Sequence, residues 1–403
     1  MEYDSQSKTL ALLPKFTGFL SLMGSLFIFQ DVVLHRFPRR RVYHRLVLGL
    51  SCSDMTASIV NIMSTWPIPA GTPGVFLARG TTQTCTAQGF FNELGNLATP
   101  LYNMSLCAYY VLVIREQWTE DKIRSKAEPI MHLVPISLAL TIAVLGLPFT
   151  LYNNSGWLCW IAAYPRGCQS NGTCARGEHA DIFRWVHYAI IWSAILFVTA
   201  GMYSIYRRVH LQERRQSQYQ LDNDVVRRGE KSKKVAIQAG LFVGALYITW
   251  IFTTITRIYQ ITTGGKNNFP LLVLMATFFP LQGFFNCLIY IRPRYLRCKS
   301  RNPDLKFRRL CIMTLYPEDN QMQASNAPDG VRHAWADGRA DGQRRSSTAS
   351  YYSTGISSKM KRSSAGNNDD IDTVNAIAAE SDFQKVNTLE VVEEPGDCDA
   401  VQP

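Results

Sequence analysis

The sequence predicts an all-α integral membrane protein: a bundle of seven transmembrane helices, with its amino terminus outside the cell and a disordered cytoplasmic tail. Three observations support this fold class. Apolar residues gather in blocks of about 20 residues that end near residue 292, and this is the length a helix needs to cross a bilayer. Lys and Arg gather in alternate loops between these blocks. Cysteines and glycosylation sequons gather in the opposite loops.

Each apolar block is long enough to span the membrane with some tilt. The seven expected spans cover residues 12–34, 46–69, 89–114, 130–152, 186–206, 235–255 and 270–291. The first span is the least apolar, because Lys15, Gln30 and Asp31 lie near its ends. The residues before it lack a basic region and a small-residue cleavage site, so we expect the first span to act as its own insertion signal.

The chain of 403 residues therefore divides into four regions. We expect a short extracellular amino terminus, the seven-helix domain, a juxtamembrane amphipathic segment and a disordered tail. Their predicted boundaries are 1–11, 12–292, 293–315 and 316–403. The tail is predicted to be disordered because it holds few large apolar side chains and is rich in Ser, Asp, Asn and Gly.

The basic loops orient the chain, whose formal net charge is +11. Most Lys and Arg follow the first, third, fifth and seventh spans, whereas the opposite loops hold few. Since Lys and Arg are in excess on cytoplasmic loops, the amino terminus is predicted to lie outside and the tail inside. No zinc finger, recognition helix or RNA-binding strand accompanies the charge, which excludes a nucleic-acid partner.

The outer loops carry the chemistry of an oxidising compartment. Four cysteines fall on this side: Cys85, Cys159, Cys168 and Cys174. The second outer loop also holds two acceptor sequons, so Asn153 and Asn171 are candidate glycosylation sites. These two signals agree with the orientation that the basic loops predict.

Five stretches carry a family resemblance. They begin at Ser21 (Ser-Leu-Met-Gly-Ser-Leu-Phe-Ile-Phe-Gln-Asp-Val), Leu50 (Leu-Ser-Cys-Ser-Asp-Met), Pro100 (Pro-Leu-Tyr-Asn-Met-Ser-Leu-Cys), Trp157 (Trp-Leu-Cys-Trp-Ile) and Pro280 (Pro-Leu-Gln-Gly-Phe-Phe-Asn-Cys-Leu-Ile-Tyr). Over about residues 10–300 the chain resembles the cyclic-AMP-receptor-like group of G-protein-coupled receptors, which is related to the secretin-type receptors. The resemblance does not imply cyclic AMP as the ligand, since many relatives have no agreed agonist.

The resemblance implies a multi-pass protein of the plasma membrane that transduces an extracellular signal to a heterotrimeric G protein, without a cofactor. It also implies an unidentified small extracellular ligand, contact with membrane lipids, and arrestin-like or kinase partners at the tail. Two parts of rhodopsin-like receptors are missing. The third span ends in Tyr109-Tyr110-Val111 rather than Asp-Arg-Tyr, and no proline follows Trp250 in the sixth span.

The same resemblance implies a disulfide between Cys85 and Cys159, supported by the Trp160 that follows. Cys168 and Cys174 then remain as a second pair that closes a small loop. Four cysteines allow three pairings, so this assignment stays open.

A buried switch network is predicted between the second and seventh spans. Asp54 lies mid-membrane, where a carboxylate is costly unless it is paired or hydrated. Asn286 stands four residues before Tyr290 and resembles the Asn-Pro-x-x-Tyr switch, and Pro280 loosens the helix above it. We expect Asp54 and Asn286 to share polar contacts, with Ser53 as a further member. The alternative is that these residues only fasten the helices together.

A ligand pocket is predicted near the outer ends of the helices. Glu93 is a buried acid about two turns below the outer end of span three, and Arg184 and Arg257 are its possible counterparts. These residues either recognise a polar or charged small molecule or form an internal ion pair. The nearby tryptophans are expected to be interfacial anchors or to pack within the outer loops, rather than to form a ligand cage. They are Trp66, Trp157, Trp160 and Trp185.

The inner face offers candidate partner sites. Basic residues flank the third inner loop and suit an acidic partner helix, although anchoring to anionic lipid explains the same charge. The predicted G-protein contacts are Arg207, Arg208, Lys233 and Lys234. In the tail, Ser347 and Ser364 follow paired basic residues and are candidate phosphorylation sites. Cys298 and Cys311 are candidate acylation sites.

Other functional classes are less consistent with the sequence. A retinal protein needs a Schiff-base lysine in its last span, and residues 270–291 contain none. An enzyme is not expected, because there is no phosphate loop, no metal-spaced His/Cys set and no nucleophile elbow. A small-solute transporter remains the alternative function, although the two halves of the chain show no repeat.

Overall fold

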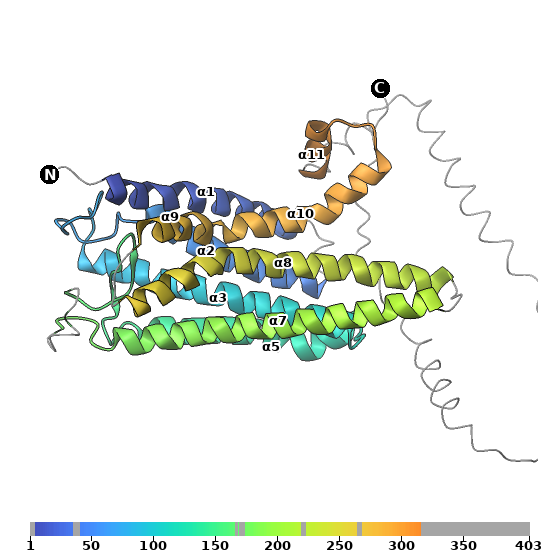
Figure 1. Cartoon of the computed structure of the whole chain (residues 1–403), viewed down its shortest axis with the longest axis horizontal. Helices are drawn as coiled ribbons and strands as arrows, with labels where there is room; N and C mark the ends of the chain where they lie inside the picture. The colour runs from blue at the N-terminus through green and yellow to red at the C-terminus, as the bar shows by residue number, and fades with distance from the viewer. Residues whose placement is uncertain are drawn as a thin grey trace, which may run out of the picture. The chain divides into compact units, whose positions relative to one another are not determined.

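A computed structural model of the chain describes residues 5–34, 41–165, 168, 174–218, 223–263 and 268–315. Within these residues, seven helical segments are long and apolar enough to cross a membrane, which confirms the predicted seven-helix fold class (Figure 1). The first six spans consist of α1 (Ser5–Leu34), α2 (Val42–Met63), α3 (Thr82–Ile114), α4 (Glu120–Lys122) with η2 (Ile123–Ala127) and α5 (Glu128–Leu145), α7 (Ala180–Gln218), and α8 (Asn223–Thr262). The seventh consists of α9 (Phe269–Phe278), η3 (Phe279–Leu281) and α10 (Gln282–Arg301).

The described part of the chain divides into two compact units, of which the first ends at Tyr290 and the second begins at Ile291. The second unit contains the end of α10 and α11 (Phe307–Leu315). There Cys298 is buried against Leu310 and Tyr295, whereas Cys311 is a free, partly exposed thiol. Burial makes Cys298 a poor acylation candidate, and Cys311 keeps that role.

Several helix ends differ from the predicted boundaries. The first helix begins at Ser5 rather than Leu12, and helix continues through Pro293 to Arg301 instead of ending near residue 292. α7 and α8 extend through most of the stretch predicted as the third inner loop. The predicted tail, with Ser347 and Ser364, lies outside the described residues.

α3 is the central helix of the bundle. In the most apolar 18-residue stretch of α3, 78% of the residues are buried, compared with 28% in the corresponding stretch of the span that contains α5. The helix α3 is therefore enclosed by the bundle, whereas α5 faces outward. α3 packs against α2, α5, α7 and α8. Its start is defined by a capping box, in which Thr81 and Thr84 each accept a hydrogen bond from the other's backbone N–H.

Small residues let α1 approach α10 closely. A Cβ added at Gly24 would lie 2.8 Å from the carbonyl oxygen of Gly283, and one added at Gly283 would overlap Oγ of Ser25. Such close backbone approach is the usual means by which transmembrane helices gain packing energy. Oγ of Ser21 also accepts a hydrogen bond from the backbone N–H of Gly283, at 3.0 Å.

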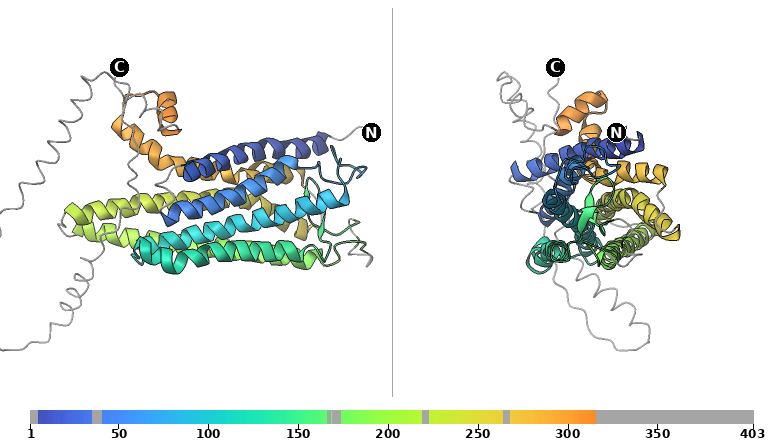
Figure 2. Two further views of the ribbon diagram at one scale, coloured as in Figure 1. Left: turned by 180° about the vertical axis from the view of Figure 1, so that it is seen from behind. Right: turned by 90° about the vertical axis from the view of Figure 1, so that its left-hand side faces the viewer.

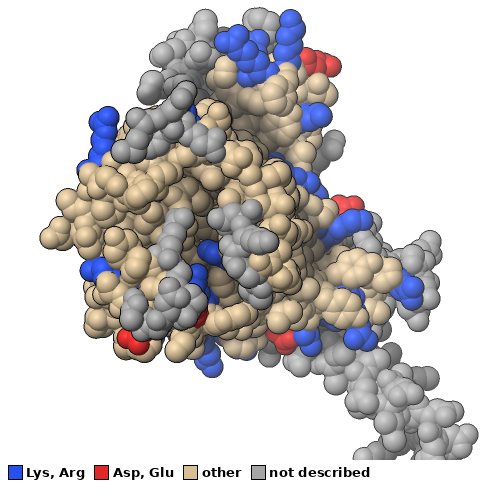
Figure 3. All heavy atoms as spheres, turned by 60° about the vertical axis from the view of Figure 1, so that its left-hand side comes forward, with Lys and Arg blue, Asp and Glu red and all other residues tan. Residues whose placement is uncertain are grey.

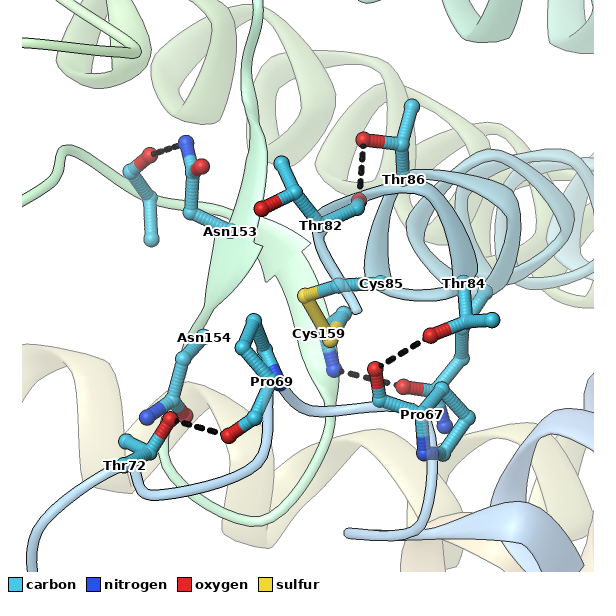
Figure 4. Close-up of a disulfide and its surroundings, with 12 residues drawn as sticks. Pro67, Pro69, Thr72, Thr82, Thr84, Cys85, Thr86, Asn153, Asn154 and Cys159 are labelled. Carbon is cyan, nitrogen blue, oxygen red and sulfur yellow. Dashed lines mark hydrogen bonds between the residues drawn. A yellow bond between two sulfur atoms is a disulfide. The ribbon is translucent and has the colours of Figure 1, made fainter. Parts of the chain in front are cut away.

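A short hairpin lies over the middle of the helix ring at one end of the bundle (Figure 2). It consists of β1 (Tyr152–Asn154) and β2 (Cys159–Ile161), paired antiparallel. A disulfide joins Cys159 to Cys85 at the start of α3 (Figure 4), and Cys168 is bonded to Cys174. Both predicted pairings are confirmed.

The hairpin contains Asn153, one of the two predicted glycosylation sites. Asn153 is buried, and its Nδ2 donates to the carbonyl oxygens of Thr150 at 2.9 Å and Ala162 at 2.7 Å. These bonds use both amide hydrogens, whereas a glycosylated nitrogen carries only one. A glycan on Asn153 would therefore replace one of these two hydrogen bonds, and Asn153 stays a predicted site. Asn171 lies outside the described residues.

Candidate functional site

A cavity of about 910 Å³ lies at the hairpin end of the bundle. Its walls come from α1, α3, α7, α8, α9 and the hairpin. Figure 3 brings this end forward and shows a surface that is mostly uncharged, with scattered Lys, Arg, Asp and Glu. A volume in this range suits a small organic molecule rather than a single ion.

One face of α8 forms a wall of this cavity. Trp250, Thr253, Arg257 and Gln260 all line it, and their spacing of three, four and three residues places them on one side of a helix. Oγ1 of Thr253 is buried and has no hydrogen-bond partner. The helix thus places an aromatic ring, a threonine side chain, a guanidinium and an amide along the cavity wall, in that order.

Arg257 is held in place by two aromatic side chains. Its Nε donates to the hydroxyl of Tyr188 at 2.7 Å, and its guanidinium carbon lies 5.2 Å from the ring centroid of Trp160. A further N–H donates to Gln260, also at 2.7 Å. Among the described residues, no carboxylate forms a salt bridge with Arg257.

Glu93 does not pair with either predicted arginine. Its wholly buried carboxylate accepts from Nε1 of Trp160 at 2.6 Å and lies 2.7 Å from Nδ1 of His187. Arg184 instead pairs with Asp181, and Arg257 lies against the face of Trp160. Of the two alternatives for these residues, the ion pair between Glu93 and an arginine does not form among the described residues.

His187 is the functional residue that the sequence analysis missed. Its signal was a histidine in an apolar span, only three residues after the arginine that was chosen. Trp160, in β2 of the hairpin, is buried and donates to Glu93, so of the two expected roles it packs within the outer loop rather than at the interface. Trp66 and Trp185 are exposed, as interfacial anchors should be.

Deeper in the bundle, Asp54 is the centre of a polar network. It accepts a hydrogen bond from Oγ1 of Thr99 at 2.9 Å and one from Nδ2 of Asn286 at 2.7 Å. Gln282 donates to Asn286 at 3.2 Å and accepts from Thr249 at 2.5 Å. The structure thus brings Asp54 and Asn286 together and joins α2, α3, α8 and α10 through them.

Two other predicted members lie outside this network. The hydroxyl of Ser53 donates to the carbonyl oxygen of Gly49 on its own helix, at 3.1 Å. The hydroxyl of Tyr290 donates to Asp31 on α1, at 2.6 Å. Pro280 lies in η3, about one and a half turns before Asn286, where the seventh span changes from α9 to α10.

Two aromatic side chains stand between the outer cavity and the Asp54 network. Trp250 and Phe279 line both the large cavity and a second, much smaller one that Asp54 also lines. Their ring centroids are 5.3 Å apart in an edge-to-face contact, and the ring of His187 lies 6.5 Å from that of Trp250. Trp250 and Phe279 thus separate the large cavity from the small one beside Asp54.

At the opposite end of the bundle, acidic side chains join three helices. Arg45 on α2 forms a bidentate pair with Glu128 of α5, with Nη2 at 2.6 Å from Oε2. Glu120 accepts from the backbone N–H of Val42 at 2.6 Å and from the hydroxyl of Tyr109 at 3.3 Å. This cluster stands at the end of α3, where the sequence lacks the Asp-Arg-Tyr motif.

The predicted partner-contact residues lie on helical extensions. At the end away from the hairpin, α7 and α8 project beyond α2, α3 and α5 (Figure 1). Arg207, Lys233 and Lys234 are exposed on these two helices, and Arg208 is half-buried. The extensions present a basic helical surface rather than a loop.

No protein-family model matches the chain. It is 25% identical over 274 residues to the protein named G-protein coupled receptor 1 of Arabidopsis thaliana, an alignment that covers 67% of this chain and 74% of that protein. Its fold is similar to that of squid rhodopsin, with a TM-score of 0.54 and 12% identity over 75% of this chain and 82% of the other. The chain has the seven-helix fold of rhodopsin.

Proposed function

We propose that this chain is a G-protein-coupled receptor of the plasma membrane, which carries an extracellular small-molecule signal to a heterotrimeric G protein. One observation carries the proposal: a ligand-sized cavity at one end shares Trp250 and Phe279 with the buried Asp54 network. The Arabidopsis relative, whose name is that of such a receptor, supports it. The motifs shared with the cyclic-AMP-receptor-like group favour that subgroup.

In this proposal the hairpin end faces outside and the extensions of α7 and α8 face the cytoplasm. The excess of Lys and Arg at the extensions supports this orientation. Ligand in the cavity shifts Trp250, the Asp54–Asn286 contact changes, and the inner ends of the helices open to an acidic helix of the G protein. Arrestin-like or kinase partners and lipid contacts belong to the same proposal.

The test is guanine-nucleotide exchange by G-protein trimers in membranes that contain the chain. The first variant changes four basic residues of the extensions to Ala: Arg207, Arg208, Lys233 and Lys234. A matched control removes four exposed basic residues elsewhere on the predicted inner side: Arg124, Lys126, Lys299 and Lys306. We expect the exchange rate to fall about tenfold or more in the first variant, which corresponds to a loss of about 1.4 kcal/mol or more of binding free energy between receptor and G protein. The exchange rate should persist in the control variant.

Two outcomes would contradict the proposal. An equal loss in both variants would indicate lipid anchoring of the basic charge rather than contact with a G protein. Absence of exchange with any trimer, both in the intact chain and in an Asp54→Asn variant designed to disturb the network, would lead us to abandon the receptor and measure solute uptake.

A further inference from the structure

We propose that the outer cavity binds a small organic anion that carries a planar ring, with its acidic group held by Arg257. This deepens the proposed function, on which it rests for the ligand's role as a signal. Binding itself is measurable without a G protein, so the two proposals can fail separately.

The charge of the cavity wall favours an anion. Besides His187 and Tyr188, the ionisable side chains that line it, among the described residues, are Asp181, Arg184 and Arg257. Asp181 and Arg184 form an ion pair, so their charges cancel. The one buried acid nearby, Glu93, is occupied by Trp160 and His187 and does not line the wall. Among the described residues, the guanidinium of Arg257 is thus left without an opposite charge, which an anionic ligand would supply.

Arg257 is also pre-organised to bind. A guanidinium has five N–H donors, and the hydrogen bonds to Tyr188 and Gln260 use two of them. The remaining donors match the two oxygens of a carboxylate or phosphate. Because Trp160 and Tyr188 fix the side chain, little conformational entropy is lost when a ligand binds.

The rest of the cavity specifies an organic body on that anion. Trp160, Tyr188, Trp250 and Phe279 supply aromatic walls, against which a planar ring packs. The side chain of Thr253 lines the cavity one turn of α8 from Arg257, but its hydroxyl is buried behind the wall, so Arg257 and Gln260 supply the polar groups of this face. The volume of about 910 Å³ is far larger than an inorganic ion needs.

The experiment measures thermal unfolding of the purified full-length chain in lipid nanodiscs. The probes are benzoate, naphthoate and phenyl phosphate, each compared with a neutral isostere such as benzamide, and inorganic phosphate serves as the anion without a ring. We expect at least one ring-bearing anion to raise the melting temperature with rising concentration, whereas neutral isosteres and inorganic phosphate do not. Comparison of carboxylates with the phosphate ester then distinguishes the two acidic groups.

One variant and two controls locate the site. Arg257→Gln should weaken the apparent anion affinity about tenfold or more, because a charge-assisted hydrogen bond is lost. Thr253→Val removes a hydroxyl that is buried behind the cavity wall, so it should fold normally and leave the anion affinity nearly unchanged. Arg79→Gln removes an exposed charge that does not line the cavity and should leave affinity unchanged.

Three results would overturn the proposal: equal stabilisation by neutral isosteres, undiminished anion binding by Arg257→Gln, or no stabilisation of a cooperatively unfolding wild-type chain by any anion at millimolar concentration. Anion binding without nucleotide exchange would contradict the receptor function and leave this site intact. Nucleotide exchange without anion binding would contradict the anion site and leave the receptor function intact.

Discussion

Asp54 and Asn286 form the contact on which the proposed switch depends, and a residue swap tests it. Asn286→Asp alone places two carboxylates where the structure has one carboxylate and one amide, 2.7 Å apart. We expect its melting temperature in detergent to fall by several degrees, since a buried charge without a donor costs roughly 1–3 kcal/mol or more. The double variant Asp54→Asn with Asn286→Asp restores an amide–carboxylate pair and should regain most of the loss. A double variant no more stable than the single one would contradict the contact.

The same two residues show what a single sequence reveals about buried polar groups. Asp54 and Asn286 were recognisable because each is polar in an apolar span and each stands in a motif. The partner of Glu93 was not, because it depends on how α3 and α7 are rotated about their axes and on Trp160 reaching in from the hairpin. His187 and Arg184 lie within one turn of α7, so depth in the membrane does not distinguish them.

The contact between α1 and α10 is the clearest test at the scale of elements. Gly24→Ala adds a methyl group 2.8 Å from a backbone oxygen of α10, which forces the helices apart. Gly244→Ala on α8 is the matched control, because a methyl group there meets nothing within 4 Å. We expect Gly24→Ala to lower the melting temperature and Gly244→Ala to leave it unchanged or raise it, since Ala is about 0.5–1 kcal/mol better than Gly in a helix. Equal effects would show that the two helices do not pack in this way.

Hydropathy located the spans well but not the ends of the helices. The stretch after the fifth span is too polar to belong to an apolar span, yet α7 and α8 continue through most of it. Gln, Glu, Lys and Arg are frequent there and are good helix formers, so the backbone remains helical beyond the apolar span. Apolar length therefore indicates the membrane-spanning part of a helix and not its full extent.

For the whole molecule, the proposed mechanism requires that the hairpin and the extensions of α7 and α8 lie on opposite sides of the membrane. The asymmetry of Lys and Arg predicts which side is which, because long-range orientation depends on charge near the ends of the spans and not on side-chain packing. The seven-helix fold of rhodopsin fits this arrangement without determining its direction.

Single cysteines at the two ends test that direction. We predict that Arg79→Cys, at the hairpin end, reacts with a membrane-impermeant maleimide on intact cells, and that Lys234→Cys reacts only after the cells are permeabilised. Both positions are exposed, so accessibility depends on the side of the membrane alone. The wild-type chain sets the background, because Cys52, Cys107, Cys287 and Cys311 are free thiols. Labelling of Lys234→Cys on intact cells would show that the topology is the reverse of the one predicted, with the basic extensions outside the cell. The proposed G-protein contact would then be contradicted, because those extensions would not face the cytoplasm.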